Sequence, residues 1–178
     1  MKLLRTIALD PSDTFVFDVA AAPGDWAVSG AFRFFDRDPA TPGGRDRAAF
    51  RSGFLGVKSW GWSTLAQIVH ATEHDRQALV DLLARQLVEQ LGAPDLATAR
   101  PAAEEEVGFA QSLCRHPVGT LIAVHRTLNA GDISESFRRL QLRQGQGHGK
   151  AFSFMEMDDD AEPDGALNLA ELGQEPRR

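Results

Sequence analysis

The chain has 178 residues, a formal net charge of −6 at pH 7 and a single cysteine. This length is typical of one compact domain, which buries about 70% of its unfolded surface without disulfides or structural metals. The acidic excess argues against nonspecific binding to nucleic acid, which requires a clustered positive surface. No apolar run approaches the ~20 residues that span a bilayer, so we do not expect a membrane protein.

The compartment follows from two features of the sequence. Cys114 is the only cysteine and cannot form a disulfide within the chain. The first ten residues hold a short apolar run that Arg5 interrupts and Asp10 ends, so they lack the core of a signal peptide. Both features predict a cytoplasmic protein.

Four strands are expected in the first third of the chain, where seven of the eleven Phe residues lie. Residues 2–9 and 14–20 are rich in β-branched and aromatic residues and flank a Pro/Asp turn, which predicts an opening hairpin. Residues 26–35 and 49–59 have a similar composition and are also predicted as strands. This part of the chain should therefore supply much of the core of the sheet.

The segment from Asp36 to Arg47 separates the last two of these strands and is rich in Asp, Arg, Pro and Gly. This composition predicts an exposed, mobile loop. Long loops in compact domains are often functional or simply disordered. The loop is therefore interpreted either as a hairpin tip or as a segment that becomes ordered on a partner.

The strongest helix pattern covers residues 73–91. Thr72 can cap the helix, and the acidic residues that follow suit the positive end of the helix dipole. Gly92 supplies the stop, and Arg85 is spaced to pair with Asp81 and Glu89 on the exposed face. One face of the helix is apolar and predicted to be buried: it carries Leu79, Val80, Leu83, Ala84, Leu87 and Leu91.

A second helix is predicted over residues 101–115, with Pro101 in its first turn and an apolar side that includes Val107 and Ala110. Alternating apolar residues then predict a meander of three strands over residues 118–128, 133–143 and 150–157. Residues 158–178 are acidic and are predicted to form a poorly ordered tail.

The predicted fold class is therefore α+β. It has a mainly antiparallel sheet of about six or seven strands, with two central helices packed on one face, in the order ββββ-αα-βββ. Residues 1–157 should form a single domain, followed by the tail of residues 158–178.

The sharpest chemical pattern is His70-Ala-Thr-Glu-His74, which has the H-x-x-E-H spacing of inverted zinc-peptidase motifs. That motif needs both histidines within one continuous helix, whereas Thr72 is predicted to cap the helix between them. We therefore expect no metal site here. The alternative hypothesis is a small metal-dependent hydrolase that uses His70, Glu73 and His74.

A second candidate is the Gly- and Trp-rich segment around Trp60 and Trp62. In an extended strand these two side chains share one face, so they either cover the core or line a concave apolar site. Arg33 or Arg51 would then anchor an anion. This face is the predicted ligand-binding or partner-binding site.

Other patterns do not support catalysis or a cofactor. The Gly-rich segment of residues 145–150 fails the P-loop pattern, because Gln144 and Ala151 occupy two of its required positions. Cys114 lies on the apolar side of a predicted helix, and there is no G-x-S-x-G elbow. The sequence predicts no cofactor and no catalytic residue.

Four short segments resemble a family of short, uncharacterised proteobacterial proteins of unknown function. They are Lys2-Leu-Leu-Arg-Thr-Ile, Asp13-Thr-Phe-Val-Phe17, Gly53-Phe-Leu-Gly56 and Trp62-Ser-Thr-Leu65. The resemblance covers most of the chain before the acidic tail. It implies a bacterial, cytoplasmic setting and supplies no activity and no site residues.

The sequence thus favours a non-catalytic binding or accessory protein whose partner is a small ligand or another protein. The binding surface would be the Trp60/Trp62 face or the loop from Asp36 to Arg47. The metal-dependent hydrolase is the competing hypothesis, and the metal content of the purified protein distinguishes the two.

Overall fold

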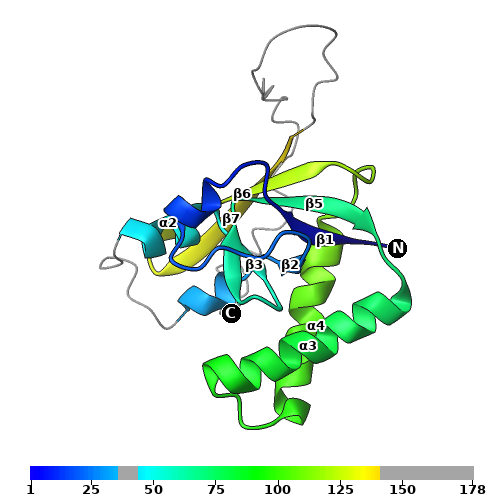
Figure 1. Cartoon of the computed structure of the whole chain (residues 1–178). Helices are drawn as coiled ribbons and strands as arrows, with labels where there is room; N and C mark the ends of the chain where they lie inside the picture. The colour runs from blue at the N-terminus through cyan, green and yellow to red at the C-terminus, as the bar shows by residue number, and fades with distance from the viewer. Residues whose placement is uncertain (36–43, 141–178) are drawn as a thin grey trace, which may run out of the picture.

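The computed structural model describes residues 1–35 and 44–140. Within them an antiparallel sheet of seven strands is combined with helices, so the predicted α+β class is confirmed (Figure 1). The strands are β1 (Lys2–Ile7), β2 (Trp26–Val28), β3 (Phe54–Gly56), β4 (Gly61–Ser63), β5 (Leu65–His70), β6 (Leu121–Asn129) and β7 (Asp132–Leu140). The helices are α1 (Asp13–Val16), the 3₁₀ helix η1 (Ala31–Phe34), α2 (Gly44–Ser52), α3 (Glu73–Leu91) and α4 (Leu96–Ser112).

The strands lie in the order β4-β3-β2-β1-β5-β6-β7, with β1 at the centre between β2 and β5. The sheet curls strongly. Phe54 of β3 and Phe137 of β7 lie with their ring centroids 6.2 Å apart, although four strands separate them in the sheet. The curl therefore brings β3 close to the edge strand β7 around the core.

The predicted helix of residues 73–91 is confirmed as α3, including its ends. Thr72 accepts a hydrogen bond from the Asp75 amide, and the Asp75 carboxylate accepts one from the Thr72 amide. Gly92 ends the helix in the left-handed conformation at φ 72°. The predicted apolar face is buried from Leu79 to Leu87, whereas Leu91 is exposed.

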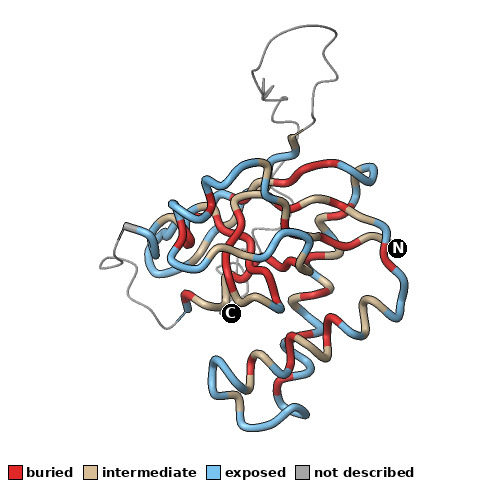
Figure 2. The backbone as a smooth tube through the Cα atoms, in the orientation of Figure 1, coloured by how far each residue is buried: buried red, intermediate tan, exposed pale blue. Residues whose placement is uncertain are grey.

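One detail of α3 was predicted wrongly. Asp81 forms its ion pair with Arg100 of α4, at 2.6 Å, and not with Arg85. The packing of α4 against α3 offers Asp81 a partner that the sequence of a single helix cannot reveal. Figure 2 shows buried residues in the sheet and along both helices.

The second predicted helix starts earlier than expected. Asp95 caps α4 by accepting a hydrogen bond from the Thr98 amide, so Pro101 lies inside the helix and not in its first turn. Val107 and Ala110 are buried as predicted. Besides packing on α3, α4 contacts β1 and β2, and it thereby closes one side of the core.

The predicted opening hairpin is wrong in its second strand. Residues 14–20 begin with the helical turn α1, and only Ala20 pairs with a strand, through an isolated bridge to Trp62. The buried Asp13 side chain explains the turn, since it accepts hydrogen bonds from the amide and the hydroxyl of Thr64. Of the large apolar residues in this segment, Phe17 is buried in the core, whereas Phe15 and Val19 are exposed.

The two following strands were predicted too long. The first ends at Val28, because Gly30 takes the left-handed conformation at φ 77° and leads into η1. A Cβ atom at Gly30 would lie 2.6 Å from Leu55 Cβ, so the close approach also requires glycine. In residues 49–59, the first part belongs to α2 and only Phe54–Gly56 is a strand.

The predicted loop from Asp36 to Arg47 is wrong at its end, because residues 44–47 open α2. Residues 36–43 lie outside the described residues. The same holds for the third strand of the predicted meander, at residues 150–157, for the Gly-rich segment and for the tail of residues 158–178. The other two strands are confirmed as β6 and β7, which are joined by a turn with positive φ at Ala130 and Gly131.

The observed order of elements differs from the predicted one because short helices interrupt the first strands. Across residues 1–35 and 44–140, none of the helices has the length and apolar character that a membrane crossing requires.

The burial pattern of α3 gives a stability prediction. Leu79 is 1% exposed, so Leu79→Ala should lower the free energy of unfolding by about 2–5 kcal/mol through lost burial and a new cavity. Arg85 is exposed, and Arg85→Ala should cost well under about 1 kcal/mol. Denaturant titration of both variants measures the difference, and equal losses would contradict the assigned buried face.

Candidate functional site

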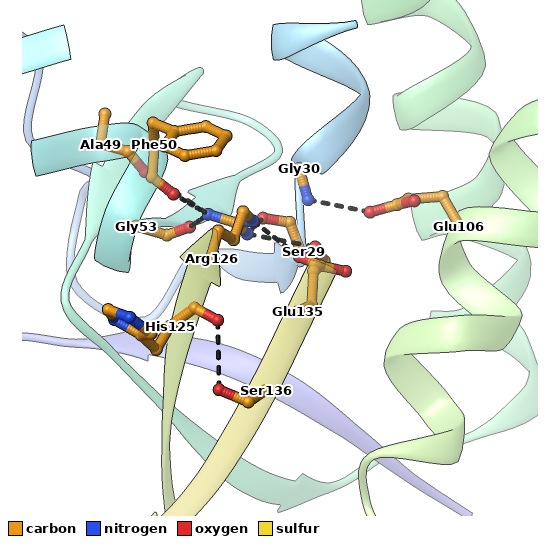
Figure 3. A network of polar contacts seen from close by, with 10 residues as sticks. All are labelled: Ser29, Gly30, Ala49, Phe50, Gly53, Glu106, His125, Arg126, Glu135 and Ser136. Carbon is orange, nitrogen blue, oxygen red and sulfur yellow. Dashed lines mark hydrogen bonds and ion pairs between the residues drawn. The ribbon is translucent and has the colours of Figure 1, made fainter. Parts of the chain in front are cut away.

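Arg126 of β6 is the largest fully buried side chain among the described residues. Its guanidinium group points into the curled sheet and uses all of its nitrogens (Figure 3). Burial lowers the pKa of Arg126, and the carboxylate of Glu135 opposes that effect. A buried cation is costly unless its donors are paired. Its partners therefore determine the local architecture.

The first group of partners is the end of α2. Nη1 of Arg126 lies 2.8 Å from the carbonyl oxygen of Gly53, 3.1 Å from that of Phe50 and 3.4 Å from that of Ala49. The last carbonyls of a helix lack partners within the helix. Arg126 donates hydrogen bonds to these carbonyl oxygens from β6, which is distant in sequence. It thereby fixes α2 against the sheet.

The second group of partners lies at the end of β2 and on β7. Nη2 donates to the backbone oxygen and to the hydroxyl of Ser29, while Nε donates to Glu135 Oε1 at 2.6 Å. The Ser29 hydroxyl also donates to Glu135 Oε1. Arg126 and Glu135 are direct cross-strand partners in the β6–β7 register. A single guanidinium group thus connects β2, α2, β6 and β7.

A second carboxylate, Glu106 of α4, lies beside this network. It accepts a hydrogen bond of 2.9 Å from the Gly30 amide, at the start of η1 (Figure 3). Burial raises the pKa of Glu106 from 4.5 to about 7, against the lowering effect of the Gly30 amide, and the Glu135 carboxylate raises it further. Glu106 therefore exchanges a proton near neutral pH.

The two carboxylates open onto a cleft of about 490 Å³ between η1, α3, α4 and β7. Its walls are mostly apolar, and the part of the chain that the structure describes contributes no Lys, Arg or His to its lining. The lining residues are Ala31, Phe32, Phe35, Leu83, Leu87, Leu91, Ala102, Glu105, Glu106, Phe109 and Glu135. An apolar cleft with convergent polar groups and a perturbed pKa is the usual form of a binding site.

The residues of the predicted tryptophan site are brought together only in part. Arg33 of η1 stacks near both indole rings, with its Cζ atom 5.1 Å from the centroid of each. Trp62 is buried and stacks on Phe34, while Trp60 is half-buried in a turn with φ 54°. The two tryptophans are therefore not successive residues on one extended face. Arg51 lies exposed on α2.

The tryptophan site and the cleft share a wall. Phe32 lines the cleft, and its ring centroid lies 6.3 Å from that of Trp60. The 3₁₀ helix η1 thus presents Phe32 to the cleft and Arg33 to the tryptophans. The indole of Trp60 can consequently report on occupation of the cleft.

The two histidines of the zinc-peptidase spacing lie in different elements. His70 ends β5, and His74 belongs to the first turn of α3, with the Thr72 cap between them. Both are exposed. Within the described part of the chain, no group of three or more His, Cys, Asp or Glu side chains could hold a metal ion.

Comparison with known proteins gives a family and no activity. Residues 1–154 match the family described as "Family of unknown function (DUF6505)". No curated protein and no solved structure matches the chain significantly.

The buried network predicts a large effect at Arg126. Arg126→Met removes the donors but keeps an apolar chain. It takes the guanidinium group from Glu135, which keeps the Ser29 hydroxyl, and from the carbonyl oxygens of Phe50 and Gly53. The free energy of unfolding should fall by about 3–5 kcal/mol. Arg115→Met is the control at an exposed arginine and should change it by less than about 0.5 kcal/mol. Similar values for both variants, measured by denaturant titration, would refute the role given to Arg126.

The separation of His70 from His74 predicts that the protein purifies without stoichiometric zinc. Elemental analysis of protein made without a histidine tag is the measurement. Zinc at one equivalent that is lost in His74→Ala would revive the hydrolase that uses His70, Glu73 and His74.

Proposed function

We propose a ligand-binding function for this chain, which belongs to the family of unknown function DUF6505 through residues 1–154. The site is the cleft between η1, α3, α4 and β7, and its occupant is a small, largely apolar molecule. The observation that carries the proposal is an apolar cleft with exposed aromatic and aliphatic side chains at its rim. Phe35 is 69% exposed, Leu91 48% and Phe109 38%.

The size and composition of the cleft support a small molecule. Its volume of about 490 Å³ lies within the range of roughly 300–1,000 Å³ of small-molecule sites. Leu83 and Leu87, one helical turn apart, contribute buried apolar surface to the lining, and Phe32 and Phe35 contribute aromatic surface. Large apolar side chains left exposed in one place are a common mark of binding sites.

The energetics of Glu106 also support a functional cleft. A glutamine at this position would accept the same hydrogen bond from Gly30 without the cost of a buried charge. A residue that lowers the stability of the fold, where another residue would not, is typical of a functional site. Among the described residues, the lining holds carboxylates but no Ser, Thr, Cys, Lys or His, and the proposal is limited to binding.

The tryptophan site with Trp60, Trp62, Arg33 and Arg51 remains a second candidate for the same binding function. The position of Arg33 supports it, because its guanidinium group lies near both indole rings and donates a hydrogen bond to the Trp60 carbonyl oxygen. A bacterial, cytoplasmic setting belongs to the same proposal. A single cysteine that is buried and unpaired suits a reducing compartment.

The cleft predicts binding of a neutral apolar probe, octan-1-ol, with a change in tryptophan fluorescence through the contact between Phe32 and Trp60. Phe35→Ser and Leu91→Ser each remove apolar surface at the rim, worth about 1–2 kcal/mol, and should weaken the probe about fivefold or more.

Phe15→Ser is the matched control, because Phe15 of α1 is 75% exposed but lies outside the cleft. It should leave the affinity unchanged within about twofold. Equal effects of the three substitutions, or no binding by the unaltered protein, would refute the cleft as the site. An effect confined to variants of Trp60 and Trp62 would move the function to the tryptophan site.

A further inference from the structure

We propose that the ligand of the cleft is an organic ammonium ion, whose apolar body fills the cleft and whose cationic head pairs with Glu106 and Glu135. This inference rests on the binding function proposed above and names the chemical class of the ligand. It follows from where the charges lie in relation to the apolar walls.

The charge of the lining has one sign. Among the residues that the structure describes, Glu105, Glu106 and Glu135 are the ionisable ones that line the cleft. The nearest buried cation, Arg126, lies behind Glu135 with a side chain that is 0% exposed, and its nitrogens are occupied by Ser29, Glu135 and the α2 carbonyls. These carboxylates would therefore repel an anion that enters the cleft, whereas they would neutralise the charge of a cation.

The carboxylates have acceptor capacity for a new donor. Each carboxylate offers about four lone-pair sites. Glu106 uses Oε1 for the Gly30 amide, and Glu135 uses Oε1 for Arg126 and Ser29. A primary ammonium group brings three donors and no acceptor, which matches an acceptor-only site. Hydrogen bonds to charged partners in an apolar cleft are also stronger than neutral ones.

The surroundings of Glu106 couple binding to a proton. Glu105 on the same helix and Glu135 on β7 disfavour its ionised form, and burial disfavours it most. Arg126 on β6 and the Gly30 amide favour the ionised form. The α3 residues that line the cleft are leucines, and Arg33 of η1 stacks near the tryptophans. At neutral pH a large fraction of Glu106 is therefore protonated before the ligand enters.

An ammonium head favours the carboxylate form, so its binding lowers the pKa of Glu106 and releases a proton to the solvent. An alkyl ammonium ion stays charged over this range, since its own pKa lies near that of Lys, about 10.4. The sign of the pH dependence follows from this. Ammonium binding should strengthen as the pH rises through about 7 and weaken below it.

Three probes with one alkyl chain separate the outcomes: octylammonium, octan-1-ol and octanoate. At about pH 8 octylammonium should bind about tenfold more tightly than octan-1-ol, and octanoate more weakly than either. At about pH 5.5 the preference for the ammonium ion should fall below about threefold. Calorimetry in two buffers of different ionisation enthalpy should show proton release on binding of octylammonium near pH 7.

Glu106→Gln should reduce the ratio of octylammonium to octan-1-ol affinity to near one. Glu104→Gln is the matched control, because Glu104 lies on the same helix, pairs with Arg100 and does not line the cleft. It should preserve the ratio. Proton release by the unaltered protein tests the same claim without any substitution.

The possible failures are distinguishable. If octan-1-ol binds and octylammonium binds no better, the binding function stands and the ammonium inference is overturned. Preferential binding of octanoate overturns it as well. If none of the three probes binds, both the binding function and the inference fall.

Discussion

The structure depends on the pairing of one buried guanidinium group. Arg126 reaches from β6 across the inside of the curled sheet, and it closes the end of α2, the end of β2 and the side of β7 at the same time. Hydrophobic contacts such as that between Phe54 and Phe137 favour the curl. Hydrophobic contacts are nondirectional, however, whereas the planar guanidinium group of Arg126 specifies which carbonyl oxygens accept its hydrogen bonds.

The same network sets the electrostatics of the cleft. Because Arg126 holds Glu135 in place, Glu106 lies next to a second carboxylate, and burial raises its pKa to about 7. A carboxyl group with a raised pKa stabilises the fold below the ordinary value of 4.5, and this contribution is lost as the pH rises through about 7. At neutral pH Glu106 thus weakens the fold while it provides the cleft with a site for positive charge.

The elements with strong local signals could be predicted from the sequence. The cap at Thr72, the apolar face from Leu79 to Leu87 and the stop at Gly92 all operate within one helix, and all three were predicted. The early strands could not be delimited, because short helices and the turn at Gly30 depend on contacts with Thr64 and Leu55 that are remote in sequence. The site was missed for the same reason, since Glu106, Arg126 and Glu135 belong to three elements. One signal was available: Arg126 continues an inward-facing series after Ile122 and Val124, and a charge in such a position calls for a buried partner.

The central claim is that Glu106 exchanges its proton near neutral pH within an apolar cleft. Carbon-detected NMR of the glutamate carboxyl groups measures this most directly, with Glu106→Gln used to assign the signal. The structure predicts a midpoint near pH 7 for Glu106, and a lower midpoint when octylammonium is bound. A midpoint at the ordinary value of 4.5, unchanged by the ammonium ion, would contradict both the buried carboxyl group and the role assigned to it.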